Sequence, residues 1–410
     1  MRILVVTQYF WPENFRINDV ALGLVSRGHE VTVYTGKPNY PEGRFFPGYG
    51  LLGRTLEDYG GARVIRVPLI PRGDGGPVRL ALNYLSYALI ASVLAPFRCR
   101  GAYDAILVYE PSPVTVGLPA LVLKRLTGAP LLFWVQDLWP ESLSATGAVR
   151  SAWILKLVER LVRYIYRRCD RILVQSRAFI EPILHFGVPA GRIHYLPNSA
   201  EALYQPVPVK PGAPERDLLP AGFRVMFAGN VGAAQNLETI IEAADGLKAY
   251  PDIQWIILGD GRMLAWVEAE VRRRGLQSTV RLLGRHPVES MPRFFALADV
   301  MLVTLRKEAI FALTIPARIQ SYLACARPIV AALDGEGARV VRESGAGIAV
   351  EAGTGPALAA AVLAMYRMAP EARADMARNA RIYFDAHFAP ARLLTELEGW
   401  MREAAAAARK

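Results

Sequence analysis

The sequence predicts an α/β protein made of two doubly wound domains, each with a parallel sheet covered by helices. Three observations predict this fold class: short apolar runs alternate with longer helical patterns, the alternation stops at a proline-rich segment, and it then starts again. At 410 residues, of which 52% are hydrophobic and 21% charged, the chain is long enough to bury two cores. The same composition excludes a disordered or collagen-like chain.

In the first half of the chain, short apolar runs predict six strands. They are residues 3–7, 31–35, 63–67, 105–108, 131–135 and 172–175. Four segments between them have the apolar spacing of a helix: 19–27, 78–96, 114–126 and 152–168. Strand, helix and strand in succession predict a parallel sheet with helices on both faces.

A segment with five prolines and few apolar residues, 205–220, interrupts this pattern and is typical of a linker, which we place at 201–222. Six further strands are then predicted at 225–228, 255–258, 280–282, 300–303, 329–331 and 347–350. The predicted helices of this half are 236–249, 265–274, 315–324 and 355–365. The domains are therefore expected at 1–200 and 223–385. Residues 371–408 are helical in composition, and 386–410 is expected to return toward the first domain.

Charge and cysteine content limit the partners. Lys and Arg number 48 against 37 Asp and Glu, and the net charge of +11 favours phosphates or acidic lipid headgroups. The basic residues are dispersed and no recognition module is present, which argues against nucleic acid. Cys99, Cys169 and Cys325 form no C-x-x-C pair, so neither disulfides nor a thiolate metal site is expected, and a reducing cytosol fits. The first apolar run turns polar at Thr7, which is too short for a secretory signal.

One segment, 80–97, has 18 residues without a charge and arginines on both sides. This length is the lower limit for crossing a bilayer, and the polar residues and Pro96 within it make it a poor membrane span. Two interpretations stay open. The basic flanks, Arg72, Arg79, Arg98 and Arg100, suit a helix that lies in a membrane surface, and the apolar content suits a helix buried against a sheet.

Glycines follow two predicted strands of the second half. Gly229, Asn230 and Gly232 come directly after one strand and before a helix, so their backbone N–H groups can hold a phosphate. Gly259 and Gly261 do the same after the next strand. A βα turn also needs glycine for its geometry alone. Neither segment is a G-x-G-x-x-G or a P-loop, so an ordinary NAD or ATP site is not indicated.

Basic residues precede the helix predicted at 315–324. Pro316 suits the first turn of a helix, which places Arg318 near a helix N-terminus, where its guanidinium can clamp a diphosphate. Arg306 and Lys307 lie a few residues earlier. The alternative for any single arginine in a basic chain is a solvated surface side chain.

Carboxylates follow two predicted strands of the first half. Asp137 comes just after residues 131–135, and Glu110 comes just after residues 105–108. Because ligands bind at the carboxyl ends of such strands, Asp137 is a candidate base or sugar-hydroxyl acceptor. Its alternative role is to cap the following turn.

Taken in order, these segments resemble the retaining glycosyltransferases of family 4. The segments that carry the resemblance are 9–13 (Tyr-Phe-Trp-Pro-Glu), 27–33 (Arg-Gly-His-Glu-Val-Thr-Val), 197–198 (Pro-Asn), 229–230 (Gly-Asn), 258–261 (Leu-Gly-Asp-Gly) and 322–330 (Tyr-Leu-Ala-Cys-Ala-Arg-Pro-Ile-Val). A narrower likeness, to the O-antigen and capsule branch that includes N-acetyl-L-fucosamine transferases, is carried by 137–142, 198–201 and 334–338.

The resemblance implies a GT-B fold, in which two Rossmann-like domains face each other across a cleft. It implies a nucleotide-diphosphate sugar held by the second domain, an acceptor held by the first, and no required metal or other cofactor. Arg318 matches the basic position before the nucleotide-contacting helix, with Arg306 and Lys307 nearby. Basic side chains and helix N-termini then stabilise the leaving diphosphate in place of a metal.

The sequence departs from the family at several positions. The E-x7-E pair is absent, because its second glutamate falls on Ser321 and its first near Leu313. Glu308 and Glu336 are candidate replacements without the expected spacing. Asn230 and the pair 235–236 (Gln-Asn) replace the usual Arg and Lys, and 14–15 (Asn-Phe) replaces a frequent glycine pair.

We therefore expect a retaining transferase that moves an N-acetylated deoxyhexose or hexosamine from a UDP-sugar to a polyprenyl-diphosphate-linked acceptor in bacterial surface polysaccharide synthesis. It is expected in the cytoplasm, peripherally on the inner face of the membrane. Asp137 is expected to orient the acceptor or move a proton, and Glu110 to contact the sugar. The alternatives are a UDP-sugar epimerase of the same fold and a catalytically silent nucleotide-sugar- or glycan-binding protein.

Overall fold

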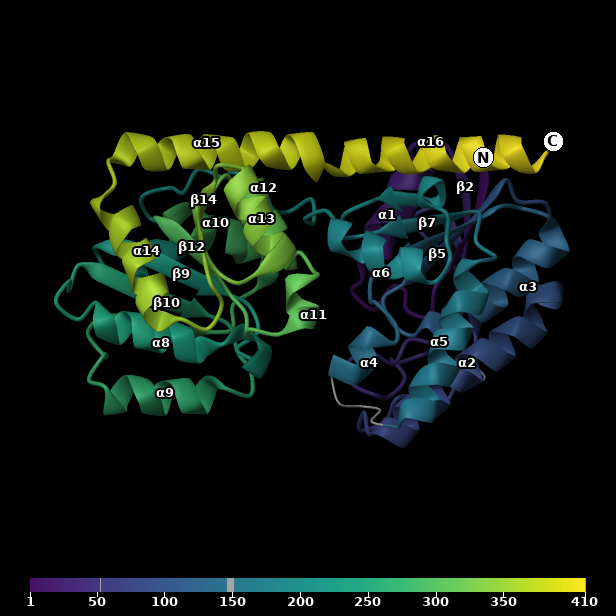
Figure 1. Ribbon diagram of the computed structural model, residues 1–410, viewed down its shortest axis with the longest axis horizontal. Helices are drawn as coiled ribbons and strands as arrows, with labels where there is room; N and C mark the ends of the chain where they lie inside the picture. Colours follow the sequence, from purple (N-terminus) through teal and green to yellow (C-terminus); the bar gives the residue numbers. More distant parts are fainter. Residues whose placement is uncertain (52, 146–150, 410) are drawn as a thin grey trace. The chain divides into compact units, whose positions relative to one another are not determined.

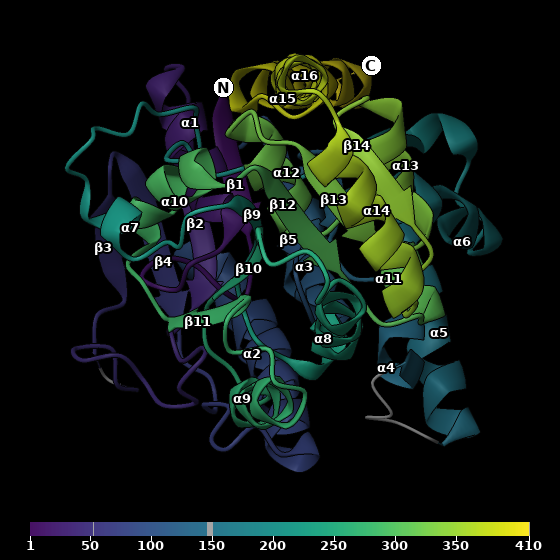
Figure 2. The ribbon, with the colours of Figure 1, turned by 90° about the vertical axis from the view of Figure 1, so that its left-hand side faces the viewer.

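The computed structural model describes residues 1–51, 53–145 and 151–409, and the chain divides into two compact units (Figures 1 and 2). Unit 1 contains Met1–Pro197 and Ala391–Lys410, and unit 2 contains Asn198–Pro390. The residues predicted as a linker, 201–222, lie in unit 2 and include a short helix, α7 (Pro214–Asp217).

Unit 1 is built on an eight-stranded sheet with the order β3-β4-β2-β1-β5-β6-β7-β8. Its strands are β1 (Arg2–Val6), β2 (Glu30–Gly36), β3 (Leu56–Tyr59), β4 (Ala62–Val67), β5 (Ala105–Glu110), β6 (Leu131–Val135), β7 (Arg171–Val174) and β8 (Ile193–Tyr195). All neighbours pair in parallel except the edge strand β3, which pairs antiparallel with β4. The order in which strands are added reverses between β1 and β5, and in doubly wound sheets ligands bind at this switch point.

Helices cover both faces of this sheet. They are α1 (Arg16–Ser26), α2 (Pro77–Arg98), α3 (Gly117–Thr127), α4 (Glu141–Ala145), α5 (Ala152–Tyr166), α6 (Ile180–His185) and α16 (Pro390–Ala408). The core cluster on one face joins α1 and α16 to alternate residues of β1, among them Ile3 and Val5. The helices α2, α3 and α5 form the layer on the other face, where α3 contacts both of its neighbours.

Unit 2 has a six-stranded, fully parallel sheet with the order β11-β10-β9-β12-β13-β14. Its strands are β9 (Phe223–Ala228), β10 (Ile253–Leu258), β11 (Val280–Gly284), β12 (Val300–Thr304), β13 (Ile329–Ala332) and β14 (Gly347–Val350). Besides α7, its α-helices are α8 (Leu237–Gly246), α9 (Leu264–Arg273), α10 (Met291–Leu297), α11 (Ala309–Ala312), α12 (Ala317–Ala324), α13 (Gly335–Glu343), α14 (Gly355–Arg367) and α15 (Pro370–His387). The switch point of this sheet lies between β9 and β12.

The expected fold class is confirmed, since both units are doubly wound α/β sheets with helices on their faces. Every predicted strand is present, and each end lies within two residues of its predicted position. Eight strands and α-helices were not predicted: β3, β8, α4, α6, α7, α10, α11 and α13. All eight are short, and β3 and β8 form the two edges of the first sheet, where an alternating or mixed pattern replaces the continuous apolar run of a buried strand.

The predicted C-terminal helical stretch consists of two helices, α15 and α16, separated by residues 388 and 389. The buried Phe388 ends α15, and Pro390 starts α16 at a position where its missing N–H is not needed. In unit 1, α16 buries Leu397 and Met401 in the core cluster that it shares with α1. The last twenty residues of the chain therefore belong structurally to its first domain.

Candidate functional site

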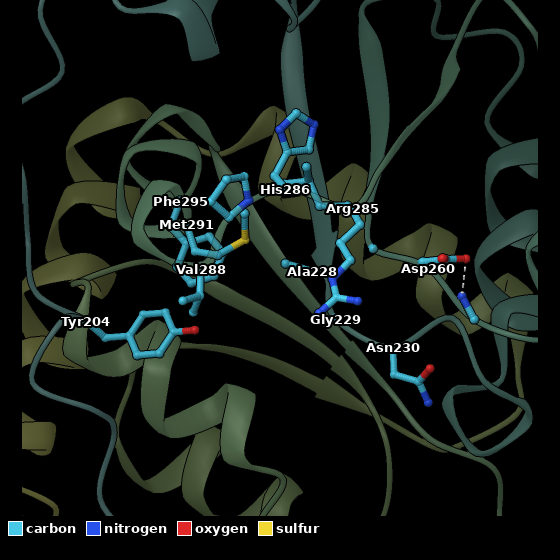
Figure 3. Close-up of a pocket in the computed structure, with 14 residues that line it drawn as sticks. Tyr204, Ala228, Gly229, Asn230, Asp260, Arg285, His286, Val288, Met291 and Phe295 are labelled. Atoms are coloured by element: carbon cyan, nitrogen blue, oxygen red, sulfur yellow. Dashed lines mark hydrogen bonds between the residues drawn. The ribbon is translucent and has the colours of Figure 1, made fainter. Parts of the chain in front are cut away.

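A cavity of about 900 Å³ lies in unit 2 at the carboxyl ends of β9, β10 and β11 (Figure 3). Three loops line it, 228–230, 258–261 and 285–288, together with Tyr204 and two side chains of α10. Of the residues predicted to bind the nucleotide, Gly229, Asn230 and Gly261 border this cavity. Gly232 lies two residues beyond Asn230. A Cβ at Gly232 would lie 2.6 Å from the side-chain nitrogen Nδ2 of Asn230.

Glycine is required where the first two of these loops approach each other. Gly229 and Gly259 both have φ near +138°, which L side chains rarely adopt. A Cβ at Gly259 would lie 1.8 Å from the carbonyl oxygen of Gly229, and a Cβ at Gly261 would lie 2.4 Å from that of Val231. The loops are thus packed backbone against backbone, and the cavity floor is main chain, as a phosphate or ribose site of this fold class needs.

Arg318 lies where unit 2 has its topological switch point. It occupies the first turn of α12, which follows β12, and a Cβ at Gly229, which follows β9, would lie 3.2 Å from its Nη2. Its Cζ is 4.5 Å from the centre of the Phe227 ring. Tyr322, one turn later, holds the helix in place, since its hydroxyl is 3.3 Å from both the backbone N and O of Ala228.

One nitrogen of the Arg318 guanidinium lacks a partner within the ranges that the structure describes. Its Nη1 is buried and has no hydrogen-bond partner among the described residues. Burial lowers the pKa of Arg318, and the nearby Tyr322 raises it. A buried donor without a partner costs free energy, and a buried cation costs more, so this atom is poised for an anionic ligand.

Arg318 touches Gly229 at the cavity border but is not itself one of the lining residues, and the remaining predicted nucleotide-binding side chains also lie outside the cavity. Arg306 pairs with Glu238 at 3.2 Å and Lys307 pairs with Glu351, all on the surface. Glu336 forms two hydrogen bonds with Arg339, at 2.9 and 3.0 Å. The Ser321 hydroxyl donates to the carbonyl of Ala317 inside its own helix at 3.2 Å. The candidate replacement Glu308 is exposed and precedes α11.

Most of the side chains that line the cavity were missed by the sequence reasoning. Arg285 and His286 follow β11, and Tyr204 stacks on Phe295 of α10 with ring centres 5.8 Å apart. In Figure 3, Tyr204, Val288, Met291 and Phe295 gather at one end of the cavity, Asn230 and Asp260 lie at the other, and Arg285 lies between them. The signal that singled out Asp137, a polar residue directly after a strand, also marks Arg285.

In unit 1, Glu110 ends β5 and Asp137 follows the neighbouring strand β6. Glu110 is completely shielded from solvent, and neither of its carboxyl oxygens accepts a hydrogen bond of normal geometry from the described residues. Burial raises the pKa of Glu110 well above its ordinary value, and the charge of Asp137 raises it further. Burial also raises the pKa of Asp137 to about 6. Because Glu110 is fully buried, it is not placed to contact a sugar as the sequence predicted, and it is the charge of Asp137 that acts on it.

A second group in unit 1 surrounds Glu13, which the sequence marked only as part of a motif. The buried Glu13 carboxylate accepts hydrogen bonds from the backbone N–H groups of Asn39 at 2.8 Å, Tyr40 at 2.7 Å and Phe10 at 3.2 Å. Burial raises its pKa to about 7, although these three hydrogen bonds lower it. Glu13 thus joins the loops after β1 and β2.

Beside this carboxylate, an aromatic cluster holds a cation. Arg72 donates from Nη1 to the Tyr9 hydroxyl at 2.7 Å, and its Cζ lies 5.0 Å from the centre of the Tyr40 ring. Tyr9 also stacks on Phe15 at 5.1 Å. Among the described residues, no group of three or more His, Cys, Asp or Glu side chains is placed to hold a metal ion.

Two family matches cover most of the chain. Residues 14–199 match the glycosyl transferase 4-like domain, and residues 222–368 match the glycosyl transferases group 1 domain. The first match lies in unit 1 up to its last two residues, and the second lies inside unit 2. The cavity and Arg318 are therefore in the group 1 domain, and Glu110 and Asp137 are in the 4-like domain.

Individual proteins give the same likeness. WcaI of Escherichia coli (strain K12), whose name assigns it to colanic acid biosynthesis as a glycosyl transferase, is 26% identical over 336 residues, which cover 79% of this chain and 81% of WcaI. Anabaena Alr3699/HepE, solved with UDP, has a TM-score of 0.70 and 15% identity, covering 98% of this chain and 100% of HepE. Sucrose-phosphate synthase from Thermosynechococcus elongatus has a TM-score of 0.72 and 17% identity, covering 99% and 100%. At these identities the solved structures establish a shared fold.

Proposed function

This chain is a glycosyltransferase of the GT-B type, and on that premise we propose that it transfers a sugar from a UDP-sugar to a polyprenyl-diphosphate-linked acceptor. The sugar we propose is an N-acetylated deoxyhexose or hexosamine, in the branch of bacterial O-antigen and capsule synthesis. The assignment of WcaI to colanic acid, by its name, supports a surface polysaccharide. The crystal structure of HepE in complex with UDP supports a uridine nucleotide.

The observation that carries the proposal is the Arg318 guanidinium, which lies against Gly229 and whose buried Nη1 has no hydrogen-bond partner in the described part of the chain. A diphosphate lying against this strand end would accept a charge-assisted hydrogen bond from Nη1 and satisfy it. As the bond between the sugar and the diphosphate breaks, negative charge grows on the leaving oxygen. A cation already fixed in a site of low dielectric stabilises that charge without having to reorganise.

The two ends of the cavity suit the two ends of a nucleotide. Tyr204, Phe295 and Met291 supply an apolar end on which a flat base can pack. Backbone at Gly229 and Gly261 supplies the polar end, where phosphate and ribose oxygens need donors. No step here uses a metal ion, and metal independence is part of the proposal.

For the acceptor, we propose Asp137 as the group that orients the attacking hydroxyl or takes its proton. Its raised pKa, about 6, lets it exchange a proton near neutral pH. Glu110 is the positioning residue beneath it, since the two carboxyls interact electrostatically and Glu110 has no surface of its own. Net retention of configuration at the sugar is proposed from the family resemblance.

The acceptor's lipid places the reaction at a membrane. We propose that the chain works in the cytoplasm, associated peripherally with the inner face of the cytoplasmic membrane. The net charge of +11 supports this, because that face is anionic.

The test measures UDP release from a panel of UDP-sugars, with and without lipid-linked acceptors, for the wild type and for Arg318→Ala. Release that depends on the acceptor and falls at least tenfold in the variant supports the transferase. Interconversion of the donor sugar without an acceptor would instead identify an epimerase. Binding of UDP without release from any donor would overturn the proposal in favour of a silent binding protein.

A further inference from the structure

Helix α2 exposes a continuous apolar stripe. Six of its large apolar side chains are between 43% and 73% exposed, and they recur every three or four residues along the whole helix: Val78, Leu82, Leu85, Leu89, Val93 and Phe97. This spacing places them on one face. A helix of a water-soluble unit normally turns such a face toward the core, so the stripe needs a partner of its own.

The opposite face of α2 is fastened to the sheet of unit 1. Tyr34 of β2 donates from its hydroxyl to the carbonyl of Ala91 at 2.7 Å, and the Tyr87 hydroxyl donates to the carbonyl of Thr7 at 2.9 Å. Buried Asn83 accepts a hydrogen bond from Gln8 at 2.7 Å. Among the described residues, α2 is the one helix long and apolar enough to cross a membrane, with a mean hydropathy of 1.6. These buried polar contacts fix α2 against the sheet of unit 1. The helix therefore exposes its apolar stripe at the surface of the unit and does not cross a bilayer.

Helix α5, in the same layer, repeats the pattern with more charge. Trp153 is 69% exposed and Leu157 is 55% exposed, and Tyr164 continues the same stripe. Lys156 and Arg160 are exposed on this face, at helical spacing from Trp153. An amphipathic helix with an aromatic, an aliphatic and basic side chains on its exposed face is typical of elements that lie in a membrane interface.

The charge of unit 1 is divided between the two faces of its sheet. The helices α2, α3 and α5 carry seven basic residues, Arg79, Arg98, Lys124, Arg125, Lys156, Arg160 and Arg163. Against these stands one acidic residue in the same helices, Glu159, and Glu181 of the adjoining α6 adds a second. On the other face, α1 and α16 carry three basic and four acidic residues. Lys124 pairs with Asp170 at 2.6 Å, and even without Lys124 the helix layer with the exposed apolar stripes is the positive one of the two.

We propose that the outer helix layer, formed by α2, α3 and α5, is a membrane-docking surface that lies on an anionic lipid bilayer. The stripes of α2 and α5 enter the interface, and the basic residues of the layer meet acidic headgroups. A neutral protein partner would bury the apolar stripes without using the charge, whereas an anionic bilayer uses both. The inference rests on the proposed function for its purpose, the delivery of a lipid-linked acceptor, but it is tested separately from catalysis.

The first experiment measures co-sedimentation of the full-length protein with vesicles of phosphatidylcholine, with and without about 30% phosphatidylglycerol. Binding is expected only to the anionic vesicles. Lys156→Gln with Arg160→Gln should weaken it about 25-fold, because each basic residue near an anionic surface contributes about fivefold. Leu85→Glu with Leu89→Glu should abolish it. The matched control, Arg392→Gln with Arg402→Gln, removes two charges from α16 on the other face and should lower binding less than twofold.

A second experiment reads the surface directly with an environment-sensitive dye on an introduced cysteine. The three native cysteines are buried, and burial raises the pKa of each thiol, so an exposed cysteine reacts selectively. Dye on Leu89→Cys or Leu157→Cys should shift to the blue when anionic vesicles are added. Dye on Ile382→Cys, which is 65% exposed in unit 2, should not shift.

Equal binding by wild type and both layer variants, or equal dye shifts at all three positions, would overturn the docking surface. A blue shift that appears without vesicles and grows with protein concentration would overturn it in favour of self-association. UDP release with a water-soluble acceptor is measured on the same variants. A variant that loses vesicle binding but still releases UDP supports the docking surface. If the wild type releases no UDP, the proposed transfer is refuted, and the conclusion from vesicle binding is unaffected.

Discussion

Gly229 and Arg318 occupy one small space at the switch point of unit 2: a Cβ at position 229 would lie 3.2 Å from Nη2 and 3.3 Å from Nε and Cζ of the guanidinium. The absence of a side chain at 229 is what allows the guanidinium to lie against the end of β9. Because Gly229 also has φ near +138°, a substitution there strains the backbone as well.

We predict that Gly229→Ala weakens UDP binding at least tenfold and lowers the free energy of unfolding by about 1–3 kcal/mol, because it strains the main chain and displaces the clamp. Titration calorimetry with UDP and urea unfolding measure the two effects. Gly399→Ala is the control. Gly399 lies within helix α16, and a Cβ there would have no atom of another described part of the chain within 4 Å. This control should leave UDP binding unchanged and add about 0.5–1 kcal/mol of stability. Unchanged UDP affinity in Gly229→Ala would contradict the role of this close approach.

Arg318→Ala should separate binding from stability. It removes a charge-assisted hydrogen bond to the diphosphate, which is worth about 1.5–3 kcal/mol, so the dissociation constant for UDP should rise roughly 10- to 150-fold. The melting temperature without ligand should not fall, because the removed cation has a buried donor without a partner among the described residues. Arg306→Ala is the comparison, since Arg306 pairs with Glu238 on the surface, and its UDP affinity should stay within twofold. Equal losses in both variants would refute the distinction that the structure draws between them.

The pKa of Asp137, raised by burial to about 6, gives a signed pH dependence. In the unfolded chain an aspartate releases its proton near pH 4, so between about pH 4 and pH 6 the folded unit holds more protons than the unfolded chain. The stability contribution of this group therefore falls as the pH rises through that window and stays low above it. Asp137→Asn removes the effect, so the stability of the variant relative to the wild type should increase from pH 4.5 to pH 7.5 by about 1–2 kcal/mol in urea unfolding. A relative stability that decreases over this range would have the wrong sign.

Much of the fold was predictable because its strands are buried on both faces. Segments such as 225–228 and 131–135 read as continuous apolar runs, and a parallel sheet covered by helices requires that pattern. The edge strands β3 and β8 do not need a continuous apolar run, and β8 has only three residues. The short helices α6, α10 and α13 span fewer than three turns, which is too short for a helical period to emerge from the sequence.

The site was predictable where position along a strand decides it. Gly229 and Arg318 were placed from a strand end and a helix start, and the structure brings these two together. Arg306 and Lys307 were chosen for charge alone, and charge does not reveal that Glu238 and Glu351 lie close enough to pair with them. Tyr204 comes from a proline-rich segment without periodicity, and only the folded chain stacks it on Phe295.

The junction of α16 with α1 gives a last test, because it ties the end of the chain to the first domain. The Glu398 carboxylate lies 2.8 Å from His29 Nε2 and 3.3 Å from Arg27 Nη1, and its side chain is only 9% exposed. Glu398→Ala leaves these donors without their acceptor and should lower the free energy of unfolding by about 2 kcal/mol. Glu396→Ala on the same helix removes only an exposed pair with Arg392 and should cost less than about 0.5 kcal/mol. Equal losses in the two variants would mean that the buried ion pair does not fasten α16. Deleting residues 390–410 should destabilise unit 1 far more than either substitution, because Leu397 and Met401 then leave their core cluster open to water.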